Sequence, residues 1–155
     1  MSFLITIVAI GKKNNVLDSE ADRYIKLLRP FATVNIVFLK SLRMPEGQDK
    51  EKIAREGKML QTKWPPGSYP VALSEEGRLM TSVKFSQWLR DLREREKRLA
   101  FTIGGAYGLS SGFKQQCKET ISLSPLTLPH KLCMVVLIEQ IYRAFTILEH
   151  HPYHK

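Results

Sequence analysis

Short apolar runs alternate with segments of helical periodicity along the whole chain. Residues 3–9 form a continuous apolar run rich in β-branched side chains, which is typical of a strand covered on both faces. Residues 17–28 then place apolar side chains at helical spacing, and Pro30 ends that segment. The two patterns repeat to the C-terminus. Strands are predicted at 3–9, 33–39, 69–73, 99–103 and 120–123, and helices at 17–28, 49–60, 81–92, 112–118 and 132–148.

This alternation predicts an α/β domain with a mostly parallel sheet and helices on both faces. A length of 155 residues is most simply a single domain, residues 1–155, and no linker or internal repeat divides it. Apolar residues make up 43% of the chain, which is enough for a core and argues against disorder.

The last predicted helix is unusual because it is apolar on almost every side. Residues 132–148 contain 13 apolar positions and only four polar ones, which are Glu139, Gln140, Arg143 and Thr146. Positions 139, 143 and 146 lie on one stripe. A domain of this size has too little core to surround such a helix, so we expect a partner surface, most simply a second copy in a homodimer.

Charge points to the class of partner. Lys and Arg exceed Asp and Glu by 24 − 15 = +9, and the pI is about 9.7. A basic domain favours a polyanion such as nucleic acid, through steering and counterion release. The alternative is a basic surface that serves only solubility.

The N-terminus and the cysteines indicate the compartment. The first apolar run has no basic residue ahead of it and no small-residue cleavage site, and no run is long enough to span a membrane. Cys117 and Cys133 lack metal-ligand spacing and are expected as buried free thiols. We therefore expect a cytoplasmic protein without a membrane partner.

Three strand ends carry distinctive residues. In α/β sheets, ligands bind at the carboxyl ends of the strands. The three ends are Leu73–Gly77, Gly104–Gly108 and Leu123–Leu128. The glycines can bring backbone N–H groups close to a cofactor, although an ordinary turn would look the same. The apolar third segment suits a flat purine ring, and a buried core loop is its alternative. The glycines match neither the GxGxxG nor the Walker pattern, which disfavours classical nucleotide binding.

The C-terminal tail holds three of the four histidines. His150, His151 and His154 could suggest a metal site, but only Glu149 accompanies them, so no metal is expected. A solvated tail is the ordinary alternative. Pro152 instead favours a rigid turn that lifts Tyr153 and His154 off the helix end.

These motifs together carry a resemblance that spans the whole chain. The order GG-x-x-G, LSPLTLPH, VVLIEQIYRAFTI and HPYHK resembles the RlmH family of SPOUT-class methyltransferases. The resemblance implies a homodimeric α/β knot that transfers a methyl group from S-adenosylmethionine to N3 of a pseudouridine. The target it implies is helix 69 of 23S ribosomal RNA. A protein this small has little surface for sequence-specific reading, so we expect the assembled ribosome as the substrate.

The resemblance also implies where the site lies, between the subunits. The substrate-side residues it implies are Arg143, Tyr153 and His154. The cofactor residues it implies are Leu73, Gly104, Gly105, Leu123, Ser124, Pro125, Leu126, Thr127 and Leu128.

Methyl transfer from a sulfonium mainly requires positioning and removal of the N3 proton. An imidazole such as His154 could accept that proton, or Arg143 could stabilise the N3 anion or hold a phosphate. The sequence leaves these roles open. Two other functions also remain, a non-enzymatic module that binds RNA or the ribosome and a different α/β enzyme that uses a nicotinamide or nucleotide.

Overall fold

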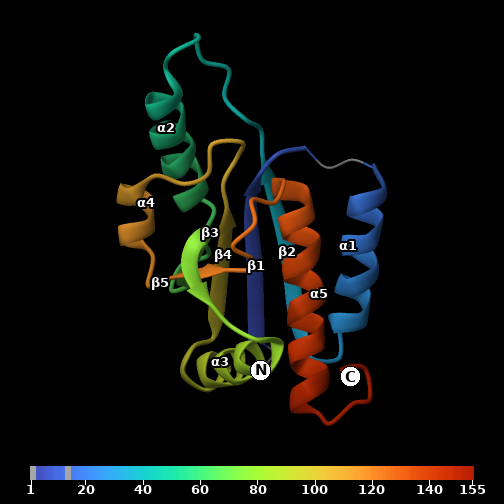
Figure 1. Ribbon diagram of the computed structural model, residues 1–155. Coiled ribbons are helices and arrows are strands. Elements are labelled where there is room, and N and C mark those ends of the chain that lie inside the picture. Colours follow the sequence, from blue (N-terminus) through green and yellow to red (C-terminus); the bar gives the residue numbers. More distant parts are fainter. Residues whose placement is uncertain (1–2, 13–14) are drawn as a thin grey trace.

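Five strands form one parallel sheet in the order β2-β1-β4-β3-β5 (Figure 1). The computed structural model describes residues 3–12 and 15–155. The strands are β1 (Phe3–Ile10), β2 (Ala32–Leu39), β3 (Tyr69–Leu79), β4 (Arg98–Ile103) and β5 (Glu119–Ser122). The predicted α/β class and all five predicted strands are confirmed.

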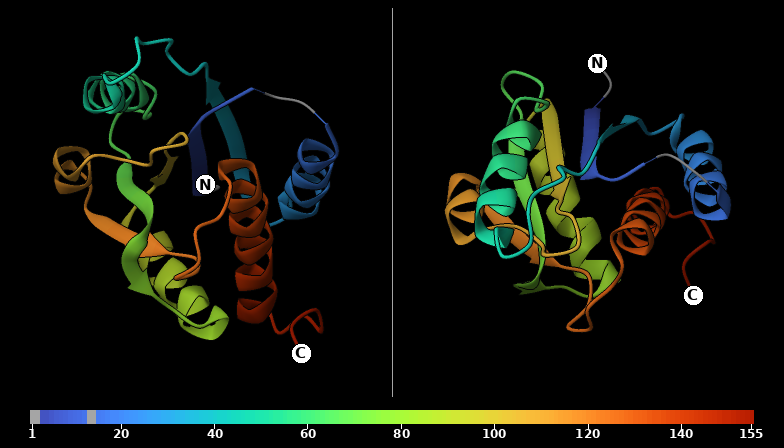
Figure 2. Two further views of the ribbon diagram at one scale, coloured as in Figure 1. Left: turned by 45° about the horizontal axis from the view of Figure 1, so that its top comes forward. Right: turned by 90° about the horizontal axis from the view of Figure 1, so that it is seen from above.

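Helices cover both faces of this sheet, as Figure 2 shows. The helices are α1 (Asn15–Leu28), α2 (Asp49–Gln61), α3 (Ser82–Arg95), α4 (Ser111–Gln116) and α5 (His130–Leu148). On one face α5 packs between α1 and α3, and α2 and α4 lie on the other. Thr81 caps α3, because its hydroxyl accepts a hydrogen bond from the backbone N–H of Lys84 at 3.1 Å.

The two layers of helices explain the unbroken apolar run of β1. Ile5 and Ile7 are fully buried in the main core with α5, whereas Val8 and Ile10 point to a smaller cluster beneath α2 and α4. Successive side chains of a strand point to opposite faces, so a strand covered on both faces must be apolar at every position. The prediction from the sequence is confirmed.

β3 differs from the prediction, which ended this strand at residue 73. Leu73 and Arg78 both pair with Ile121 of β5, so residues 74–77 leave the ladder as a bulge before pairing resumes. Gly77 makes this possible, because a Cβ atom there would lie 2.6 Å from the carbonyl carbon of Ile121. Absence of a side chain lets the bulged strand run against β5.

The chain leaves β5 through a link, residues 123–129, before it enters α5. This link lies beside the β3 bulge, where the Thr127 hydroxyl donates a hydrogen bond to Glu75 at 3.0 Å. α5 then runs back between α1 and α3. This arrangement is consistent with the α/β knot that the resemblance implies.

A buried ion pair anchors the start of α5 to α1. The ammonium group of Lys131 lies 2.9 Å from the Asp18 carboxylate, and both side chains are largely buried. The same ammonium lies 4.1 Å from the ring centroid of Phe38, so Lys131 also contacts β2 through a cation–π interaction.

We expect Lys131→Met to lower the free energy of unfolding by about 3 kcal/mol, because the Asp18 carboxylate then stays buried without its ammonium partner. Urea denaturation at one protein concentration measures this change. Glu20→Gln, which removes the exposed pair with Arg23, is the control and should cost less than about 0.5 kcal/mol. Equal losses in the two variants would contradict the anchoring role.

Candidate functional site

The three distinctive strand ends meet in one cleft of about 330 Å3 at the carboxyl edge of the sheet. Its walls come from the start of the β3 bulge, from the glycine loop and from the link after β5. We call residues Gly104–Gly108, which follow β4, the glycine loop. The predicted cofactor residues that line the cleft are Leu73, Gly104, Gly105, Leu123, Ser124, Leu126, Thr127 and Leu128. Pro125 is exposed and lies outside the lining. Tertiary structure thus brings together all but one of these residues.

The glycine loop is a tight backbone turn. The N–H of Gly108 donates a hydrogen bond to the carbonyl of Gly105 at 3.0 Å, and Gly108 has a φ of +75°. A Cβ atom on Gly104 would lie 2.6 Å from the carbonyl group of Gly108. Gly104 is therefore required by the shape of the loop itself, before any ligand approaches it.

Local hydrogen bonds hold the link at the opposite wall. The Ser122 hydroxyl donates to the carbonyl of Ser124 at 2.8 Å, and the Ser124 hydroxyl accepts from the N–H of Leu126 at 3.0 Å. Leu126 is 71% exposed. The alternative of a buried core loop is wrong, because this link presents apolar side chains and irregular backbone to the cleft.

Two carboxylates of the β3 bulge connect the walls of the cleft. Glu75 accepts the hydrogen bond from Thr127, and Glu76 forms an ion pair with Lys114 of the α4 segment at 3.1 Å. The bulge therefore contacts both the link and α4. These charged groups line the cleft together with the backbone of the glycine loop.

A second cluster of polar groups lies at the far end of α5. The guanidinium of Arg143 donates to the Glu139 carboxylate at 2.7 and 3.0 Å, and it also lies over the Tyr153 ring. The Tyr153 hydroxyl donates to the same carboxylate at 3.0 Å. Arg143 Nη1 lies 3.1 Å from His154 Nδ1. The tail is thus folded back onto α5, which contradicts the alternative of a solvated tail.

The electrostatics of this cluster restrict what its groups can do. Burial, followed by hydrogen bonds to Tyr24 and Glu139, raises the pKa of Tyr153, so this phenol stays protonated and acts as a donor. The hydrogen bond to Glu139 raises the pKa of Arg143, which stays charged. A guanidinium can only donate, so Nδ1 of His154 accepts and its neutral ring carries a proton on Nε2.

Within one chain, the cleft and the Arg143 cluster lie apart. Cys133 lines the cleft at the start of α5, whereas Arg143 follows it by ten residues. At a rise of 1.5 Å per residue this separation is about 15 Å along the helix axis. The cleft and the Arg143 cluster are therefore separate sites within one chain.

The structure adds residues to those that sequence reasoning singled out. Glu139 orients both Arg143 and Tyr153, and its signal was the polar stripe on an otherwise apolar helix. Lys114 and His130 line the cleft, and no pattern in the sequence marked Lys114. Among residues 3–12 and 15–155 no group of three His, Cys, Asp or Glu side chains is arranged to hold a metal ion. No helix in this described part is both long and apolar enough to cross a membrane.

Comparisons with known proteins agree with this geometry. A family model described as "Predicted SPOUT methyltransferase" matches residues 3–154. Proteins named "Ribosomal RNA large subunit methyltransferase H" from Bacillus pumilus and Listeria monocytogenes are 36% and 38% identical, each alignment covering 97% of this chain and 99% of the relative. A solved structure of "a probable methylase family protein" from Haemophilus influenzae shares the fold with a TM-score of 0.56 at 13% identity, covering 97% of this chain and 70% of that one.

The two cysteines provide a test of burial beside the cleft and away from it. Burial raises the pKa of both Cys117 and Cys133 to about 11. Since only the thiolate reacts, we expect alkylation of each to rise about tenfold per pH unit between pH 8 and 10. Rates measured for each peptide by mass spectrometry check this. A plateau near pH 9, as an exposed thiol would show, would contradict this shielding. The sequence predicted both thiols as buried, whereas the structure leaves each of them half-buried.

Proposed function

This chain belongs to the SPOUT methyltransferase family, and on that premise we propose which RNA it modifies and how its residues act. It is an S-adenosylmethionine-dependent methyltransferase, and the proposed acceptor is N3 of a pseudouridine in helix 69 of 23S ribosomal RNA. The observation that carries this proposal is the full-length similarity to ribosomal RNA large subunit methyltransferases at 36% to 38% identity. The proposed setting is the assembled ribosome in the cytoplasm.

The size and the lining of the cleft support the proposal that the cofactor binds there. Its volume of about 330 Å3 falls in the usual range for ligand sites. The apolar side chains of Leu123 and Leu128 suit a purine ring, and the glycine loop allows close approach of backbone groups. S-adenosylmethionine supplies an activated methyl group, so the residues of the cleft have only to bind and orient it. A module that only binds RNA would have no use for this cleft.

A homodimer is proposed because one face of α5 remains only partly covered. We call this the open face, and its members are Leu132, Val135, Val136, Glu139, Gln140 and Arg143. Leu132 is 37% exposed. If the open faces of two copies pack antiparallel, the Arg143 cluster of one copy approaches the cleft of the other. This packing would cover the apolar residues and remove the separation along α5.

The geometry of the tail argues against the proton-accepting role considered for His154. Nδ1 of His154 is occupied by the hydrogen bond from the guanidinium of Arg143, so this nitrogen is not free to take the N3 proton. The N–H on Nε2 can instead donate to an oxygen of the base. We therefore propose that Arg143 and His154 stabilise the negative charge that develops as N3 loses its proton. Glu139 and Tyr153 hold Arg143 in place.

We expect the protein to transfer the labelled methyl group of S-adenosylmethionine to ribosomes that lack the modification, and Gly104→Ala to abolish this transfer because the glycine loop cannot close. Transfer to ribosomes measures activity, and calorimetry measures cofactor binding. The proposed function is wrong if the protein neither binds the cofactor nor methylates ribosomes.

Mixed dimers test whether the two copies share each site. Gly104→Ala loses the cleft and His154→Ala loses the tail group, so each homodimer should be inactive or weak. Random pairing makes half of the dimers mixed, each with one intact composite site, and should restore about a quarter of the normal activity. A site built within one chain would show no recovery, and a monomeric mass by light scattering would contradict the dimer.

Substitution of His154 separates donation from proton acceptance. We expect His154→Ala to lower the rate at saturating ribosomes about 100-fold, and His154→Gln to retain much more activity because its amide still donates. Both variants should recover partly as pH rises, since the N3 proton then leaves more readily. Equal loss in the two variants would favour a proton-accepting imidazole, and a change confined to the ribosome KM would indicate a binding role.

A further inference from the structure

A segment rich in Lys and Arg projects beyond the carboxyl edge of the sheet (Figure 1). We call residues 40–58 the basic arm, which comprises the connection after β2 and most of α2. It holds six Lys or Arg and four Asp or Glu residues. Glu56 is buried, and Glu51 is paired with Arg55. The remaining exposed charge of the arm is therefore mainly positive.

The base of the basic arm is fixed against the glycine loop. The buried Glu56 carboxylate accepts hydrogen bonds from the Ser41 hydroxyl at 2.9 Å and from the N–H of Leu42 at 3.0 Å. Its other oxygen lies 3.4 Å from the position that a Cβ atom of Gly105 would occupy. The Glu56 carboxylate thus holds the segment that follows β2 against α2 at the edge of the cleft.

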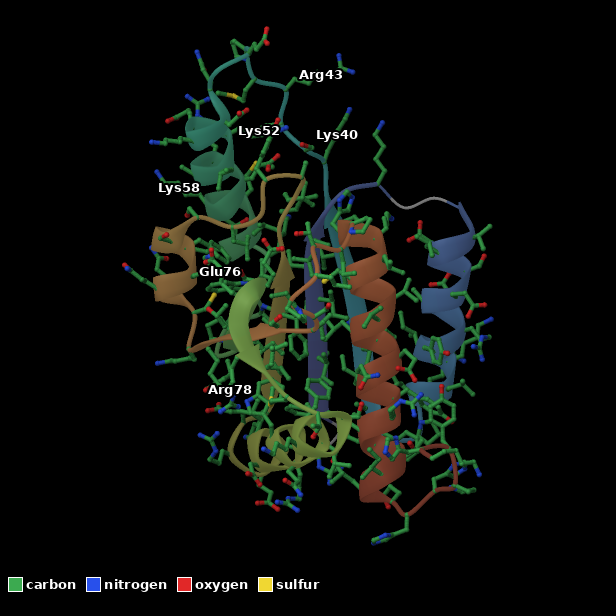
Figure 3. The ribbon with its side chains drawn as sticks, in the orientation of Figure 1. Lys40, Arg43, Lys52, Lys58, Glu76 and Arg78 are labelled. Atoms are coloured by element: carbon green, nitrogen blue, oxygen red, sulfur yellow. The ribbon has the colours of Figure 1, made fainter. Side chains whose placement is uncertain are left out.

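Three cations of the arm, Lys40, Arg43 and Lys52, lie beyond the carboxyl edge of the sheet (Figure 3), and Lys52 is next to the cleft. The ammonium of Lys52 lies 5.9 Å from the ring centroid of Tyr107, a lining residue that is 59% exposed. Lys40 and Arg43 are exposed on the connection. Lys58 follows Lys52 by six residues, or about 240° around the helix, and points away (Figure 3).

These three cations are available to a partner. Within the described ranges 3–12 and 15–155, the ion pairs involve other residues and leave Lys40, Arg43 and Lys52 without a carboxylate partner. Unpaired cations on a fixed scaffold suit the phosphates of a nucleic acid, since each contact releases a counterion. Phosphate contacts set the position and orientation of an RNA. The exposed ring of Tyr107 could stack on an unpaired base beside them.

We propose that the basic arm docks the ribosomal RNA backbone and so positions the acceptor nucleotide over the cleft. Lys40, Arg43 and Lys52 contact phosphates, and Glu56 is a positioning residue. This inference rests on the proposed function for the identity of the RNA. It adds a binding surface that is separate from the cofactor cleft and from the Arg143 cluster.

The test compares two triple variants of the full chain that remove the same charge. The arm variant is Lys40→Gln, Arg43→Gln, Lys52→Gln. The control is Lys58→Gln, Lys63→Gln, Lys97→Gln, which changes the arm lysine that points away from the cleft and two exposed lysines outside the arm. We expect the arm variant to raise the ribosome KM at least tenfold, with kcat and cofactor affinity little changed. The control should stay within about twofold.

Salt dependence and cross-linking identify what the arm contacts. Loss of three phosphate contacts should reduce the slope of log Kd against log salt concentration for ribosome binding by about two to three. A photoreactive benzophenone residue at position 43 should cross-link to ribosomal RNA. Cross-links mainly to a ribosomal protein would overturn the proposal.

The outcomes separate this inference from the proposed function. If the unaltered protein methylates ribosomes and the arm variant behaves like the control, the docking surface is wrong and the function stands. If the unaltered protein binds ribosomes without methylating them, the proposed function fails while the binding and cross-linking comparison still decides the role of the arm. Equal losses in both triple variants would show only a general charge effect and would also overturn the proposal.

Discussion

The packing of α5 between α1 and α3 is the constraint on which the rest of the structure depends. Its buried side chains form much of the main core, and the buried pair of Lys131 and Asp18 anchors its first turn. A helix of 19 residues spans about 28 Å. One end can therefore lie at the cleft while the other carries the Arg143 cluster. Because the helix is rigid, the distance between these two groups within one chain cannot be shortened.

The cleft depends on backbone that departs from regular strand geometry. β3 leaves its ladder at residues 74–77 and returns against β5, where only a residue without a side chain fits at Gly77. The glycine loop after β4 turns just as tightly at Gly104. These two departures open a space between strand ends that regular pairing would close. The bulge then contacts the opposite walls through Glu75 and Glu76.

Charge has a different role in each part of the molecule. At the start of α5 a buried pair anchors a helix, and at its end Glu139 orients Arg143 without removing its positive charge. In the basic arm the only buried carboxylate, Glu56, accepts hydrogen bonds from backbone and hydroxyl groups instead of neutralising a cation. The net charge of +9 is thus partly structural and partly free for a polyanionic partner.

The sequence by itself determined the elements and the family. Apolar runs and helical spacing are local patterns, so they located all five strands and the main helices, and the motif strings from GG-x-x-G to HPYHK indicated the SPOUT class. Contacts between distant residues were decided only by the tertiary structure. The extension of β3 depends on pairing with Ile121, and the tautomer of His154 depends on the guanidinium of Arg143. The separation of the cleft from that guanidinium also follows from how α5 packs, because no local pattern records the distance between two sites across a folded chain.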